Sequence, residues 1–70
     1  MKTSTAERFR TRVDDLQGRI ARRMRAMDAL DEATGLHRAD DRDAFMQLFF
    51  DTRDDVRELG AAVAEYSRGA

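Results

Sequence analysis

Two stretches of equal length decide the fold: residues 9–30 read FRTRVDDLQGRIARRMRAMDAL, and residues 45–66 read FMQLFFDTRDDVRELGAAVAEY. In each stretch, apolar residues recur at alternating spacings of four and three, which is typical of one face of an α-helix. The recurring positions of the first stretch are Phe9, Val13, Leu16, Ile20, Arg23, Met27 and Leu30. Those of the second stretch are Phe45, Phe49, Thr52, Val56, Leu59, Val63 and Tyr66.

Folding the chain between Leu36 and His37 brings the two patterns into register. Each residue of the first pattern then lies opposite one residue of the second. The residue numbers of every such pair sum to 75 or 76, so the register is constant along the whole hairpin. The pairs are Leu30 with Phe45, Met27 with Phe49, Arg23 with Thr52, Ile20 with Val56, Leu16 with Leu59, Val13 with Val63, and Phe9 with Tyr66. We therefore predict an all-α fold, an antiparallel two-helix hairpin.

Capping signals indicate where the helices begin and end. Ser4 and Glu7 have the spacing of a capping box, which predicts a helix start at about residue 5. Gly35 suits the left-handed position that ends a helix, and Asp40 or Asp41 is expected to cap the second helix. We predict a single domain over residues 1–70, with a first helix over about 5–33, a turn over 34–40 and a second helix over about 41–67.

The chain is close to the lower size limit for independent folding. It has 70 residues and no cysteine, so disulfides and thiolate metal sites cannot supplement its core. Two helices that share one seam bury little apolar surface, and self-association is a common remedy in chains of this size. We expect a homodimer that forms a four-helix bundle.

Arg23 is the one charged residue in the predicted seam, opposite Thr52. A buried guanidinium without partners would be costly, so we expect Arg23 to reach outward or to meet Asp51 or Asp55. Such a polar layer fixes the register of two helices, in the way that a single polar core residue does in a coiled coil.

One side of the second helix carries apolar and small residues outside the predicted seam. Met46 and Phe50 lie one turn apart, and the side continues into small residues, which suits an approaching helix. We predict that this side forms the self-association or partner interface. Its residues are Met46, Phe50, Arg53, Arg57, Gly60, Ala61 and Ala64.

Arginines flank the apolar stripe of the first helix. Between residues 8 and 25 there are seven arginines against two aspartates, and carboxylates gather on one face of the second helix. Our leading interpretation is that these charges pair within the hairpin. An anionic partner or nucleic acid is the alternative, and its contact residues would be Arg8, Arg12, Arg19, Arg22 and Arg23.

The sequence lacks the patterns that usually mark an enzyme. Its single histidine, His37, falls in the predicted turn, and no phosphate-binding loop or metal-ligand spacing is present. We expect no catalysis, no cofactor, no metal and no small-molecule substrate. No apolar run could cross a bilayer and no signal peptide is recognisable, so we expect a cytoplasmic protein without membrane contact.

Composition narrows the choice of partner. The chain has 13 basic and 14 acidic residues, a balance that argues against a general polyanion binder. We predict a small non-catalytic protein-interaction module, a regulator, inhibitor or assembly factor that binds itself and another protein. The alternative function is a nucleic-acid-binding regulator that uses the arginines of the first helix.

Overall fold

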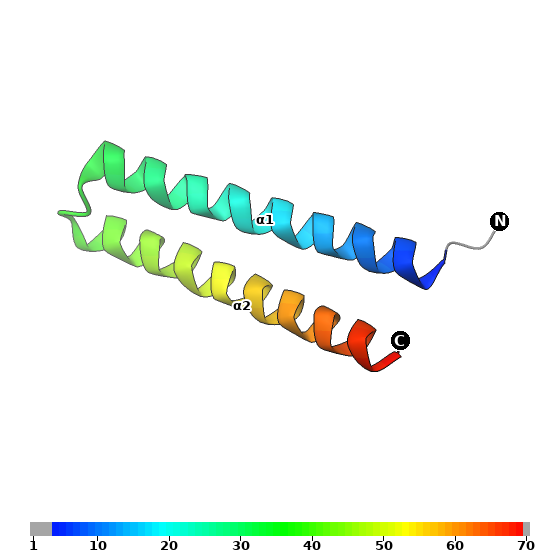
Figure 1. The fold of residues 1–70 in the computed structure, drawn as a ribbon. Helices are drawn as coiled ribbons and strands as arrows, with labels where there is room; N and C mark the ends of the chain where they lie inside the picture. The colour runs from blue at the N-terminus through cyan, green and yellow to red at the C-terminus, as the bar shows by residue number, and fades with distance from the viewer. Residues whose placement is uncertain (1–3, 70) are drawn as a thin grey trace.

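The protein is a hairpin of two long helices, α1 over Thr5–Thr34 and α2 over Ala39–Gly69. The structure, a computed structural model, describes residues 4–69, and residues 1–3 and 70 lie outside this description. The helices run side by side in opposite directions, so the start of α1 and the end of α2 lie at the same end (Figure 1). This end is called the open end below. The predicted all-α hairpin is confirmed.

The start of α1 follows its predicted cap. The Ser4 hydroxyl accepts a hydrogen bond from the backbone amide of Glu7 at 3.1 Å, and Ser4 has an extended backbone conformation. This bond satisfies one of the amides that have no partner in the first turn of a helix.

The connection between the helices is short because two successive residues adopt left-handed backbone conformations. Gly35 has φ 64° and donates its amide to the Asp31 carbonyl at 2.7 Å, as predicted for a helix C-cap. Leu36 follows with φ 58°, and its amide donates to the Thr34 hydroxyl at 3.1 Å. These bonds close α1 and reverse the chain within a few residues.

The predicted cap of α2 is wrong, because α2 begins at Ala39 and places Asp40 and Asp41 inside its first turn. In the turn itself, the guanidinium of Arg42 donates to the carbonyls of Leu36 at 3.1 Å and His37 at 2.8 Å. The two aspartates still lie near the positive end of the helix dipole.

The seam of α1 is as predicted. Its recurring positions are buried or half-buried from Phe9 to Leu30, and Leu16 is the only large side chain in residues 4–69 that is almost fully buried, at 1% exposed. The predicted pairing of Phe9 with Tyr66 is confirmed at the open end, where the two rings stack with centroids 4.2 Å apart. The two helices are therefore aligned at this end as the pattern required.

The seam of α2 differs from the prediction at every second position. Phe49, Val56 and Val63, predicted to lie in the core, are about half exposed, at 49%, 50% and 44%. Leu48, Asp55 and Ala62 occupy the seam in their place, each one residue earlier in the chain. The unchanged seam positions are Phe45, Thr52 and Leu59, which are half-buried. Helix α2 is thus turned about its axis relative to the prediction.

The seam residue Arg23 provides the physical reason for this rotation. Its guanidinium lies between the helices and needs carboxylate partners. Asp55 meets this need only when it faces α1, and turning α2 to bring Asp55 inward carries Val56 outward. Leu48 and Ala62 then supply apolar contacts in the neighbouring layers.

The hairpin is a thin plate. Its principal extents are 51 × 21 × 13 Å, and the last of these is close to the diameter of a single helix. The radius of gyration is 15.9 Å, whereas a compact domain of this length has about 11 Å. Both broad faces of the plate are therefore open.

Replacement of Gly35 tests the turn. In Gly35→Ala the added Cβ would lie 2.7 Å from the His37 side chain, and φ 64° is unfavourable for alanine. We expect a loss of about 1–2 kcal/mol in the free energy of unfolding, measured by urea denaturation. The matched control is Gly18→Ala, whose Cβ would meet only the end of the Arg22 side chain at 3.4 Å. This control should gain up to about 1 kcal/mol, and equal losses in both variants would contradict the assignment.

Candidate interaction surfaces

A charged layer crosses the middle of the seam. The Arg23 Nε donates to the Asp55 Oδ2 at 2.7 Å, and its Nη1 donates to the Asp51 Oδ2 at 3.2 Å. Asp55 is 5% exposed, which makes it the one buried charged residue among residues 4–69. The prediction that Arg23 meets Asp51 or Asp55 is confirmed, because it meets both.

Ion pairs continue from this layer along one broad face of the plate, here called the charged face. Arg12 lies 3.4 Å from Glu58, and Arg19 lies 3.8 Å from Asp55 and 3.9 Å from Glu58. The side chains of Arg12, Arg19 and Glu58 are about half exposed, so solvent weakens these pairs. Their main effect is to favour the antiparallel alignment of α1 and α2.

The arginines predicted to meet an anionic partner thus divide into two groups. Arg12, Arg19 and Arg23 contact carboxylates of α2, whereas Arg8 and Arg22 are exposed and form no ion pair within residues 4–69. Three of the seven arginines of α1 are therefore paired with carboxylates of α2 within the described residues.

The opposite broad face carries an exposed apolar row on α2. Phe49, Val56 and Val63 follow one another at intervals of seven residues, so they form a single row along α2. Met24, which is 53% exposed, lies on the same broad face of the plate. Met24 directly follows the seam residue Arg23 on α1, just as Val56 directly follows the seam residue Asp55 on α2, and in antiparallel helices these two positions point to the same face. We call these four residues the apolar face.

The predicted interface residues lie on the side of α2 that points away from α1. All seven are exposed, among them Met46 at 52% and Phe50 at 42%. Phe50 meets Phe49 edge to face with centroids 5.9 Å apart, and the Arg53 guanidinium lies 5.8 Å from the Phe50 ring centroid. This outer side of α2 therefore borders the apolar face.

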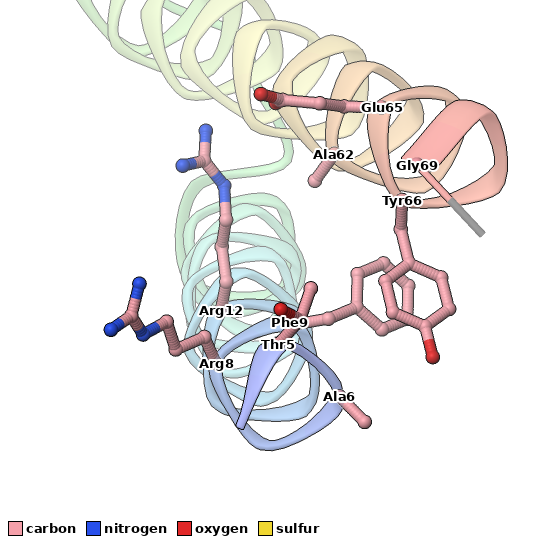
Figure 2. A pocket seen from close by; sticks show the side chains of 9 residues that line it. All are labelled: Thr5, Ala6, Arg8, Phe9, Arg12, Ala62, Glu65, Tyr66 and Gly69. Atoms are coloured by element: carbon pink, nitrogen blue, oxygen red, sulfur yellow. The ribbon is translucent and has the colours of Figure 1, made fainter. Parts of the chain in front are cut away.

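A cleft of about 520 Å³ lies between the helices at the open end. Figure 2 shows the stacked rings of Phe9 and Tyr66 on one side, with Arg8 and Arg12 projecting to the other. The small side chain of Ala62 lies between them and leaves the space open. The cleft has two cations and one carboxylate, Glu65, at its edge, but no nucleophile paired with a base.

Within residues 4–69, no group of three or more histidine, aspartate or glutamate side chains is placed to hold a metal ion. Neither α1 nor α2, in its described part, contains a segment that is long and apolar enough to cross a bilayer.

Comparison of the chain with protein-family models, with curated proteins and with solved structures gave no match.

Sequence reasoning missed the apolar face, because it placed Phe49, Val56 and Val63 in the core. A signal was nevertheless present. A second apolar row, one residue earlier at each alternate position, runs through Leu48 and Ala62 and includes Asp55. The requirement of Arg23 for a carboxylate favours this second row.

The charged layer leads to a stability prediction. Asp55→Asn removes the carboxylate charge that Arg23 contacts at 2.7 Å. The side chain of Asp55 is almost fully shielded from solvent, at 8% exposed. We expect a loss of about 1–3 kcal/mol in the free energy of unfolding, measured by urea denaturation. Asp54→Asn is the matched control, since Asp54 is its exposed neighbour and should change stability by less than about 0.5 kcal/mol. Similar effects in both variants would show that the layer does not stabilise the hairpin.

Proposed function

We propose that the protein is a small non-catalytic protein-interaction module that works as a homo-oligomer, with two hairpins forming a four-helix bundle. The observation that carries this proposal is the exposure of large apolar side chains on a plate one helix thick. A regulator, an inhibitor or an assembly factor of the cytoplasm fits such a module.

The small core supports the proposal. Only Leu16 and Ala62 are buried apolar residues within the described range, whereas seven large apolar side chains are at least 36% exposed. The accessible surface is 5589 Å², compared with about 4,500 Å² for a typical folded monomer of this mass. A partner that covers apolar surface would provide the stabilisation that the isolated hairpin lacks.

The distribution of charge favours a protein partner over nucleic acid. A surface that binds phosphates needs arginines that are free to neutralise them. Arg12, Arg19 and Arg23 would have to leave Glu58, Asp51 or Asp55 before they could do so. The apolar face offers the opposite chemistry, because hydrophobic contact with another protein requires no rearrangement of these pairs.

Measurement of the molecular mass in solution tests the proposal. Sedimentation equilibrium over micromolar concentrations should give twice the chain mass of 8.0 kDa. Dissociation on dilution should be accompanied by loss of helical circular dichroism, because the separated hairpin has little core. A mass of 8.0 kDa at every concentration would contradict self-association.

The nucleic-acid alternative makes a separate prediction. If the arginines of α1 bound RNA or DNA, a gel-shift titration would show binding that weakens steeply with added salt. Arg8→Ala and Arg22→Ala would weaken it further, because these arginines form no ion pair within residues 4–69. We expect no shift at about 50 mM salt, and a clear shift would favour the alternative.

A further inference from the structure

The apolar face of α2 has an internal symmetry. Val56 lies midway between Phe49 and Val63, seven residues from each, which is about 10 Å along the helix. Consider two copies stacked with their apolar faces together. A twofold axis that lies between the two plates, perpendicular to α2 and at the level of Val56, would place Phe49 of one copy on Val63 of the other. Val56 would then meet Val56 of the other copy.

We propose that a second copy of this chain covers the apolar face, with α2 packed antiparallel on α2 and the twofold axis at Val56. This inference rests on the proposed function and names its contact surface. It differs from the interface expected on the outer side of α2, around Met46 and Phe50, because it uses residues that were predicted to lie in the core.

The pairing is complementary in size. The apolar row of α2 carries the bulky side chain of Phe49 near the turn and the smaller side chain of Val63 at its other end. Antiparallel packing places the bulky end of each copy against the smaller end of the other. In the alternative dimer, the turns of the two copies lie at the same end of the bundle. Val63 of one copy would then meet the part of α1 of the other copy that contains Arg10 and Asp14.

The pairing is also complementary in charge. Arg19 forms ion pairs with Asp55 and Glu58, so it marks the level of Val56 on α1. Arg10 and Asp28 lie nine residues before and nine residues after Arg19. Helical phase places both on the side of Met24, since Arg10 precedes Met24 by two heptads and Asp28 follows it by one turn. The axis that pairs Val56 with itself therefore brings Arg10 of each copy toward Asp28 of the other.

The size of the plate suits a dimer. The plate measures 51 by 21 Å, which gives roughly 1,000 Å² in projection, and a standard interface covers about 800 Å² of each partner. Two plates of one-helix thickness would form a bundle of four helices with Val56 at its centre. The ion pairs of Arg12 and Arg19 would remain on the outside, where they are solvated.

Charge substitution at the axis tests the inference. Val56→Glu would place two carboxylates against each other, and Val56→Lys would do the same with two ammonium groups. Each variant alone should dimerise at least about 100-fold more weakly, measured by sedimentation equilibrium. An equimolar mixture of the two should recover both the dimer mass and the helical circular dichroism, because Glu then meets Lys.

Phe50→Glu is the matched control, since Phe50 is an exposed apolar residue on the outer side of α2. This variant should keep the dimer mass. If Phe50→Glu becomes monomeric and Val56→Glu stays dimeric, the chain self-associates as proposed but the apolar face is not its interface. If the mixture of Val56 variants fails to recover the dimer, the position of the axis is wrong. If the unaltered chain is monomeric, self-association itself fails.

A single cysteine provides a test that keeps the surface nearly unchanged. The chain has no cysteine of its own, so Val56→Cys introduces one thiol for each copy. At a twofold axis the two Cβ atoms approach closely enough for a disulfide. Mild oxidation should therefore cross-link Val56→Cys at least about tenfold faster than Phe50→Cys. Equal rates, or faster cross-linking of Phe50→Cys, would overturn the proposed pairing.

Discussion

A guanidinium in the middle of a helix–helix seam needs carboxylates close by, and the arrangement of this hairpin depends on that need. Arg23 meets Asp55 at 2.7 Å and Asp51 at 3.2 Å, both on α2. Leaving this partly desolvated charge without its partners would cost more than burying one more valine would contribute, because the seam offers the guanidinium no other hydrogen-bond acceptors among the described contacts. The rotation of α2 follows from this balance.

That rotation separates the plate into two chemically different faces. Asp55 turns inward, and the carboxylate of Glu58 lies beside Arg12 and Arg19 on the charged face. Val56 turns outward with Phe49 and Val63 on the other side. The structure therefore links a buried ion pair to an exposed apolar row: the interaction that orients the helices within one chain also creates the surface on which we propose that a second chain packs.

The fold was largely predictable from the sequence, whereas the apolar face was not. The hairpin, the Ser4 cap, the Gly35 turn and the pairing of Phe9 with Tyr66 all depend on local signals or on a seven-residue repeat, and these are visible in one sequence. The rotation of α2 depends on an energy difference between two rows that are one residue apart. A pattern of apolar residues alone cannot measure this difference, because it does not include the desolvation of Arg23.

The most direct test of this account is a methyl NOESY spectrum that shows which residues of α2 face α1 within one chain. The account predicts strong contacts from the Ala62 methyl to apolar side chains of α1, and at most weak contacts within the chain from the Val56 methyls to Ile20. Strong contacts from Val56 to Ile20, together with an Ala62 methyl that touches only solvent, would show that α2 has the rotation expected from the apolar pattern alone and would contradict the account.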